Sequence, residues 1–263
     1  MRRFFRLYKT FVVQYFKQLM EYRIDFLTGA LSFLINQLTN ILFISIIFDN
    51  IPALSGFSRY EIYFIYGFSL LPKGLDHLLT DNLWKIAYFI VRKGDFDKYL
   101  TRPINPLLHV IMELFQFDAL GEFVTGIVLL TYASIKLDIH FGPVEILVLL
   151  LAIIIGTLIF TSIKILFAAL ALWIKRSGSI LQIFYMSSDF ARYPVTIYSK
   201  PIKFIITYII PFGFTAYYPS TYFIRGNSPL FALGIGGLAA AILFTISITV
   251  WNRGLSAYES AGS

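Results

Sequence analysis

Long apolar runs separated by short polar segments dominate the chain. Several of these runs approach the roughly 20 residues that an α-helix needs to cross the apolar layer of a bilayer. The pattern predicts an all-α membrane protein with six transmembrane helices in one domain over residues 24–254, followed by a tail at 255–263. The predicted spans cover residues 26–48, 60–84, 110–132, 144–173, 180–198 and 229–250.

The first residues show a different periodicity, with apolar and polar side chains on opposite faces of a helix over residues 3–21. One face carries aromatic side chains such as Phe4 and Tyr8, and the other carries Arg3 and Arg6. A basic face opposite an aromatic face is typical of a helix that lies in the headgroup plane. We expect residues 1–23 to form an amphipathic interfacial helix, and the alternative is a solvated helix packed on the protein.

One predicted span is irregular. Pro72-Lys73-Gly74 interrupts the second span, and Asp76, His77 and Asp81 follow. Such breaks are tolerated at membrane depth only where protein or water covers the freed backbone. This span is therefore either kinked, or it leaves the membrane early and continues as a helix to Val91.

A proline-rich but apolar stretch follows the fifth span. Proline at this density prevents one continuous helix. We expect short re-entrant helices over residues 199–219, which dip into the membrane and return. The residues singled out in this stretch are Pro194, Pro201, Pro211, Phe212 and Pro219.

Composition supports a membrane protein. The 263 residues are 57% hydrophobic and only 14% charged, whereas about a quarter of the residues in a soluble domain are charged. The chain has no cysteine, which excludes disulfides and Cys-ligated metals and fits a bacterial inner membrane.

The net charge is +7. In a membrane protein the placement of Lys and Arg residues is more informative than their sum, so we do not interpret this charge as a sign of nucleic-acid binding. Most Lys and Arg residues fall on the side of the N-terminus, which predicts that both termini are cytoplasmic in a bacterial cytoplasmic (inner) membrane. The outer side receives Arg59, Lys136, Arg192, Lys200, Lys203 and Arg225.

Some polar side chains fall inside the predicted spans, where a buried charge costs on the order of 3 kcal/mol or more. They either contact substrate or ions, or they pair helices by bonding to bases such as Lys85, Lys164 or Lys175, and we favour pairing. We expect Lys164 itself to extend its ammonium group to the inner interface. The candidate residues are Asn36, Asn40, Glu113, Asp118 and Glu122.

The most charged segment lies between the second and third spans. Asp95, Asp97 and Lys98 alternate with Phe96, Tyr99 and Leu100, which predicts an amphipathic turn that presents apolar anchors to a soluble partner. The alternative is a solvated connector. The candidate partner-coupling residues, within a loop over residues 92–106, are Arg92, Lys93, Gly94, Asp95, Phe96, Asp97, Lys98, Tyr99, Leu100, Arg102 and Pro103.

Motifs for catalysis or cofactor binding are missing from the sequence. It has no Gly-x-x-x-x-Gly-Lys-Ser/Thr string for phosphates and no Gly-x-Ser-x-Gly elbow. His77, His109 and His140 lie far apart, without the spacing of metal ligands. We expect no enzyme activity, no metal and no cofactor on this chain, so any ATP is bound by another polypeptide.

Four groups of residues resemble type-two ABC exporter permeases, and in particular a bacterial subgroup. The resemblance covers essentially the whole chain, and it rests on the order and spacing of these groups together. They are Gly94-Asp95-Phe96-Asp97-Lys98-Tyr99-Leu100-Thr101-Arg102-Pro103-Ile104-Asn105-Pro106, Arg192-Tyr193-Pro194-Val195-Thr196-Ile197-Tyr198, Ile210-Pro211-Phe212 with Tyr218-Pro219, and Trp251-Asn252-Arg253-Gly254-Leu255 with Tyr258-Glu259-Ser260-Ala261-Gly262.

The resemblance implies a membrane subunit that pairs with itself or with a sister permease. Two copies of an ABC ATPase subunit, which carry ATP and Mg, would dock on loop 92–106, and the proline-rich segment would cap the path. The alternatives are a proton- or ion-coupled secondary transporter or channel that uses the acids of the third span, and an integral membrane enzyme acting on lipids. Relatives export drugs, peptides, lipids or polysaccharides, so the resemblance does not determine the substrate.

Overall fold

The structure, a computed structural model, describes residues 10, 12–14, 16–17, 20–21 and 23–260. The predicted interfacial helix over residues 1–23 therefore lies mostly outside the described residues. Every regular element of the described part is helical, apart from an isolated bridge between Leu54 and Phe57. The prediction of an all-α protein is confirmed.

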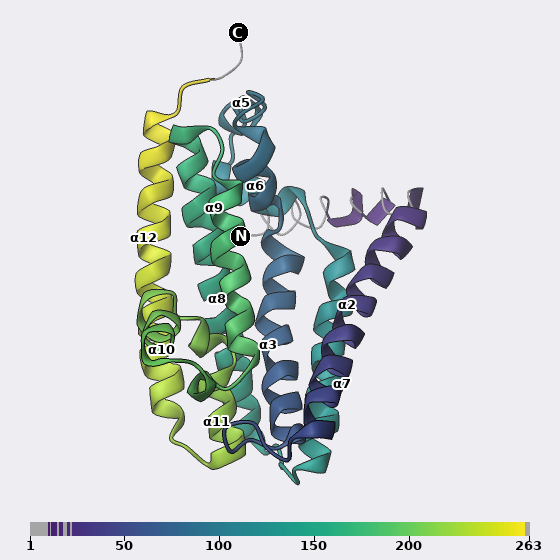
Figure 1. The fold of residues 1–263 in the computed structure, drawn as a ribbon. Helices are drawn as coiled ribbons and strands as arrows, with labels where there is room; N and C mark the ends of the chain where they lie inside the picture. The colour runs from purple at the N-terminus through teal and green to yellow at the C-terminus, as the bar shows by residue number, and fades with distance from the viewer. Residues whose placement is uncertain (1–9, 11, 15, 18–19, 22, 261–263) are drawn as a thin grey trace.

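Long helices lie side by side and form the body of the molecule, with α3 between the edge formed by α2 and α7 and the edge formed by α12 (Figure 1). Their lengths follow from long, mainly apolar runs, which in lipid favour helices that satisfy every backbone group internally. They are α2 (Arg23–Asn50), α3 (Arg59–Thr80), α7 (Leu120–Lys136), α8 (Pro143–Ile174) and α12 (Gly236–Ala257).

Among the described residues, four helical stretches are long and apolar enough to cross a membrane. They correspond to the first, third, fourth and sixth predicted spans, so the chain is a multi-pass membrane protein. The stretches are Leu27–Asn50, Phe117–Lys136, Pro143–Ile174 and Phe231–Ala257.

Short helices connect the long ones. α5 lies at the same end of the molecule as the last residues of α12, and α11 lies at the opposite end (Figure 1). The α-helical connectors are α4 (Asn82–Lys85), α5 (Asp97–Leu100), α6 (Pro106–Glu113), α9 (Gly178–Met186), α10 (Lys200–Phe204) and α11 (Tyr217–Arg225). The 3-10 segments are Phe117–Ala119, Ser187–Arg192, Val195–Ile197 and Phe212–Thr215, and the π-helical segments are Ile86–Ile90, Ile205–Ile209 and Phe231–Ile235.

Helix α3 continues through Pro72, so the sequence Pro72-Lys73-Gly74 does not end the helix. The surrounding helix α8 makes this possible, because it covers the proline closely. The hydroxyl of Thr157 donates to the carbonyl of Pro72 at 3.3 Å, and a Cβ on Gly156 would lie 2.8 Å from the ring of Pro72. Beyond Thr80 the chain stays largely helical to residue 90.

The third predicted span begins later than residue 110. Helix α6 ends at Glu113, Leu114 is extended with φ −130° and ψ 131°, and α7 starts only at Leu120 after a 3-10 turn. The break has a tertiary cause, since the backbone N–H of Gln116 donates to the carbonyl of Leu78 at 3.1 Å and satisfies the end of α3. Glu113 is therefore outside the span.

The fifth predicted span is also shorter than expected, because α9 ends at Met186 and gives way to 3-10 turns. The following proline-rich stretch divides into short helices, as predicted. Pro201 stands in the first turn of α10, and Pro211 directly precedes the 3-10 turn Phe212–Thr215.

Helices α3 and α7 approach each other at the level of their backbones. A Cβ added at Gly67 would lie 2.8 Å from the backbone nitrogen of Leu130, and one at Gly126 would lie 3.0 Å from the carbonyl oxygen of Gly67. Small residues at such a crossing allow the dispersion contacts that drive helix association in lipid. This crossing fixes the position of the charged half of α3.

Candidate functional site

Charged residues form one face of α3 in the half of the helix that follows Pro72. Three charged or ionisable residues follow Lys73 at spacings of three, four and eight positions: Asp76, His77 and Asp81. Residues at these spacings share one side of an α-helix. The face meets α8 and α9, whose polar side chains complete a cluster.

Lys164 of α8 is the buried centre of the cluster. Its Nζ lies 2.9 Å from Asp76 and donates to Asp81 at 2.8 Å, and the side chains of Lys164 and Asp76 have no exposed surface. The expectation that Lys164 extends to the inner interface is therefore wrong. Two carboxylates on the neighbouring helix supply the compensation that a buried ammonium requires.

Hydroxyl groups satisfy the remaining lone pairs of Asp76. Tyr185 of α9 donates to its Oδ2 at 2.8 Å, while Thr80 and Thr161 donate to its Oδ1 at 2.7 Å and 2.9 Å. Such full satisfaction is what makes a buried ionic network tolerable in a low-dielectric environment. The network joins α3, α8 and α9 at one point.

A second group of charges lies beside this network. His77 is 2.8 Å from the buried carboxylate of Glu122, and its ring stacks on Tyr185 at a centroid distance of 5.4 Å. Asp189 accepts from Arg192 at 2.8 Å and from Lys73 at 3.4 Å. These contacts bring together ionisable side chains from α3, α7 and the segment after α9.

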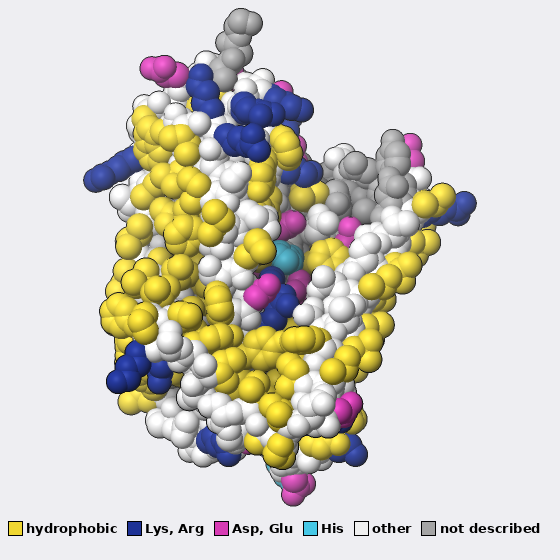
Figure 2. All heavy atoms as spheres, viewed as in Figure 1, with side chains coloured by type: hydrophobic (Ala, Val, Ile, Leu, Met, Phe, Trp, Pro, Cys, Tyr) yellow, Lys and Arg dark blue, Asp and Glu magenta, His cyan; other side chains and the backbone are white. Residues whose placement is uncertain are grey.

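A cleft of about 370 Å³ opens on these groups. Figure 2 shows it as a hollow about half-way along the molecule, where a histidine and side chains of both charges gather between apolar surfaces. The cleft combines aromatic walls with ionisable groups at membrane depth, where such groups mark a substrate or ion path. Its lining residues are Phe33, Lys73, His77, Asp81, Trp84, Gln182, Tyr185, Met186 and Asp189.

The structure separates the polar residues predicted within the spans. Asn40 accepts from Arg192 at 3.4 Å at the edge of the charged group and also donates to Asn36 at 3.0 Å. Glu122 reaches the cluster through His77. Asp118 instead bonds to Gln116 at 3.2 Å and faces Gly29 of α2, so Asp118 and Glu122 contact different helices.

The predicted apolar anchors of the charged loop point inward. Phe96 and Tyr99 are fully buried, and the ring of Phe96 contacts Trp251 of α12 and Tyr258 at centroid distances of 6.1 Å and 5.0 Å. Neither ring can contact a partner in this conformation, so this part of the prediction is wrong. Both rings instead fix the loop on the protein, and Gly94, with φ +79°, makes the turn into it.

Polar contacts hold the loop as well. Asp97 accepts from Tyr258 at 3.0 Å and from Ser260 at 2.6 Å. Glu113, at the end of α6, accepts from Lys98 at 2.9 Å and from the hydroxyl of Tyr99. Burial raises the pKa of Glu113, but the hydrogen bonds from Tyr99 and Lys98 outweigh burial and hold this pKa below its usual value.

The exposed surface of the loop is mainly basic. It keeps one large apolar side chain, Leu100, which is exposed near Pro103. The exposed charged residues are Arg92, Lys93, Asp95, Lys98 and Arg102.

A continuous set of contacts runs from this loop to the cleft. Asn82 donates to the carbonyl of Val110 at 2.8 Å and to Glu113 at 3.4 Å. Its neighbour in the chain is Asp81, which accepts from Lys164. The loop and the buried network are thus linked through the Glu113 carboxylate, the buried amide of Asn82 and one peptide unit.

The proline-rich segment packs against the far side of the network. Phe212 is fully buried, and its ring lies 5.2 Å from that of Phe160, which contacts Tyr185 at 5.4 Å. Pro194, Pro211 and Pro219 are buried, whereas Pro201 is exposed.

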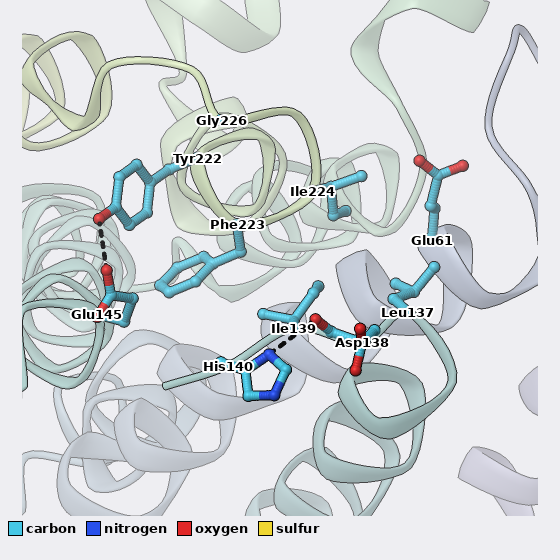
Figure 3. Close-up of a pocket in the computed structure, with 10 residues that line it drawn as sticks. All are labelled: Glu61, Leu137, Asp138, Ile139, His140, Glu145, Tyr222, Phe223, Ile224 and Gly226. Atoms are coloured by element: carbon cyan, nitrogen blue, oxygen red, sulfur yellow. Dashed lines mark hydrogen bonds between the residues drawn. The ribbon is translucent and has the colours of Figure 1, made fainter. Parts of the chain in front are cut away.

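A second cavity, of about 440 Å³, lies between the ends of α3, α7 and α8 and helix α11. Figure 3 shows Glu61, Asp138, Glu145 and Tyr222 around it. Its carboxylates are partly engaged: Glu61 pairs with Arg225 at 3.1 Å, and Glu145 accepts from Tyr222 at 3.4 Å. Among the described residues, no group of three or more His, Asp or Glu side chains is arranged to hold a metal ion.

Sequence reasoning missed Tyr185, Trp84 and Asp189, and it assigned Arg192 to the outer side although the side chain lies beside the cleft. The helical spacing of Lys73, Asp76, His77 and Asp81 was a signal that could have found the charged face of α3. No comparable signal marks Tyr185, because one tyrosine in an aromatic-rich chain is not distinctive.

The chain matches the model of a known protein family. The family model described as "ABC-2 family transporter protein" matches residues 34–262. A search of curated proteins finds no significant match.

Proposed function

The chain belongs to the ABC-2 family of transporter membrane proteins, and on that premise we propose that it is the membrane-spanning permease subunit of an ATP-driven exporter. It works as a dimer of permease subunits, homomeric or with a sister chain. Two separate ATPase subunits bind ATP and Mg and supply the energy. The chain itself serves transport rather than catalysis.

The observation that carries the proposal is the rigid, basic loop and its link to the cleft. Phe96, Tyr99 and Asp97 hold the loop on the protein, so a force on the loop is not lost in local motion. Glu113 and Asn82 then connect it to the Lys164 network. Coupling between distant sites requires such contiguous contacts.

The exposed face of the loop defines the docking surface for the ATPase. Arg92, Lys93 and Arg102 favour an acidic partner surface through electrostatic complementarity. Leu100 supplies an apolar contact at its centre. In this arrangement the loop face, rather than Phe96 and Tyr99, meets the partner, and residues 92–106 are the coupling element.

Six crossings fit the arrangement of the helices. Helix α3 has the length of a span, and the charges that lower its hydropathy are enclosed by α7, α8 and α9. The segment that begins with α9 supplies the fifth crossing, and residues 199–219 form a re-entrant cap at the outer side. Both termini and the loop then face the cytoplasm of a bacterial cell.

The second permease subunit docks on α2. This helix exposes a row of large apolar side chains, including Leu31, Leu38 and Leu42. Such a row offers the van der Waals contacts that drive helix association in lipid. Because the cleft opens next to α2, a second subunit at this face would place two clefts around one path.

Co-purification from the native membrane tests the proposal. We expect a companion chain with a P-loop, and vanadate-sensitive transport after reconstitution of both chains in liposomes. Full transport by the isolated chain, with no companion protein present, would overturn the proposal.

The docking surface has its own test in the reconstituted complex. Lys93→Glu with Arg102→Glu is expected to reduce ATPase binding at least about tenfold, because charge reversal at an interface costs more than about 1.4 kcal/mol. Lys136→Glu, an exposed lysine at the other end of the molecule, is the matched control. Equal binding by both variants would exclude this surface as the docking site.

A further inference from the structure

We propose that the cleft binds a positively charged amphiphile, a molecule with an ammonium group on an apolar body. The inference rests on the proposed function, since it names the class of molecule that the permease moves. It is carried by the charge balance of the cleft, by two half-open carboxylates and by the aromatic wall.

The charged side chains that line the cleft are two carboxylates, Asp81 and Asp189, and one ammonium group, Lys73, with His77 beside them. This excess of carboxylates over ammonium groups suits a ligand cation, whereas a ligand anion would add negative charge at membrane depth, where an uncompensated charge is costly.

Two carboxylates direct this excess toward the cleft. Lys73 and Arg192 both contact the same oxygen of Asp189, Oδ1, and the side chain of Asp189 remains 49% exposed. Asp81 contacts Lys164 through Oδ1 and is 26% exposed. The second oxygens of Asp81 and Asp189 are therefore available to an ammonium group.

The walls between these carboxylates are aromatic and apolar. Trp84 lies edge-on to Tyr185 at 5.3 Å, and Phe33 and Met186 complete the lining. The face of Tyr185 already attracts cations, since the Nζ atoms of Lys73 and Lys164 lie 5.4 Å and 5.3 Å from its centroid. Aromatic faces next to carboxylates are the chemistry that recognises organic ammonium groups.

Trp84 makes binding measurable in the full chain without an ATPase. The protein in nanodiscs of zwitterionic lipid is titrated with 12-bromododecyltrimethylammonium, whose bromine quenches tryptophan, and with 12-bromododecyl sulfate as the anion of equal chain length. We expect the cation to quench at a concentration at least about tenfold lower than the anion does, and Trp84→Phe to remove this saturable quenching.

Two substitutions of opposite sign test the electrostatic argument. Asp189→Asn is expected to weaken cation binding about tenfold, because it removes the half-open carboxylate, and Lys73→Gln is expected to strengthen it, because it removes a competing cation. Asp138→Asn, an exposed carboxylate at the opposite end of α7, is the control and leaves both titrations unchanged.

Stronger binding of the anion, or no change of the cation titration in Asp189→Asn, would overturn the proposed ligand class. That result would leave the permease assignment intact, because assembly with an ATPase is measured separately. Conversely, a chain that binds the cation but transports without a companion would overturn the proposed function alone.

Discussion

Lys164 shows how one residue can determine the state of several others. Its ammonium group compensates Asp76 and Asp81 at once, and no solvent reaches it. Removing one member of a buried ionic group leaves the other charges without compensation, and this costs about 3–5 kcal/mol. We therefore expect Lys164→Met to lower the thermal unfolding midpoint strongly in detergent.

The compensated variant distinguishes charge from shape. Lys164→Met combined with Asp76→Asn and Asp81→Asn removes the stranded carboxylates, so most of the lost stability is expected to return. Lys136→Met, an exposed lysine on α7, is the control. The interpretation is wrong if Lys164→Met unfolds at the same temperature as this control.

Glu113 gives the loop a pH dependence. Burial raises the pKa of Glu113, and the hydrogen bonds from Tyr99 and Lys98 lower it by more, so the folded pKa lies below the unfolded one. The contribution to loop docking is thus fully present above the unfolded pKa of about 4.3. It is lost as the pH falls through the folded pKa.

Hydrogen exchange of residues 92–103, measured by mass spectrometry with correction for intrinsic rates, can follow this loss. We expect protection in the native protein to fall below about pH 4 by an amount equivalent to about 0.5–1 kcal/mol, since Glu113 and Lys98 are both partly exposed. Glu113→Gln should show the reduced protection already at neutral pH. Native-like protection in Glu113→Gln would refute the assignment.

At the scale of the elements, the crossing of α3 and α7 makes a specific prediction. Gly67→Ala places a methyl group 2.8 Å from a backbone nitrogen of α7, and overpacking of this kind costs about 1–3 kcal/mol. Gly121→Ala is the matched control on α7, because its Cβ would lie 3.9 Å from the nearest atom, on Phe33. We expect thermal unfolding to separate the two variants.

An equal or higher midpoint for Gly67→Ala would show that the helices can move apart without loss. Alanine at position 121 is expected to be neutral or slightly stabilising, since alanine favours helix by up to about 1 kcal/mol over glycine.

Elements defined by local pattern could be predicted from the sequence, and those defined by tertiary contacts could not. The spans near residues 26–48, 144–173 and 229–250 were found because each is a long, mainly apolar run. The break after Glu113 depends on a bond between Gln116 and Leu78, and no local signal announces it. Likewise, the sequence indicates that Lys164 lies inside a span but not that Asp76 meets it from another helix.

At the scale of the whole molecule, a set of contacts connects loop 92–106 to a cleft about half-way along the molecule, and these contacts pass through the side chain of Asn82. Asn82→Leu keeps a similar volume but removes the hydrogen bonds to Val110 and Glu113. Coupling free energies between sites are about 1–3 kcal/mol. We expect this variant to assemble with its ATPase yet lose ligand-stimulated ATP hydrolysis at least about fivefold.

Asn50→Leu provides the comparison, because Asn50 is exposed at the last residue of α2 and bonds only within that helix, to Ile46. It is expected to retain stimulation. Full stimulation in Asn82→Leu, measured at saturating ATPase, would exclude this route of coupling.

The backbone contact between α3 and α7 also limits how the molecule can change shape. Helices that touch through Gly67 and Gly126 cannot slide past each other without collision. We therefore expect α3 and α7 to move together as one rigid unit. Any opening of the cleft must then pivot where the chain is not α-helical, at the π-helical segment Ile86–Ile90 and at the extended Leu114. These two points lie on either side of loop 92–106 in the chain, so we expect them to act as the hinges of the α3–α7 pair.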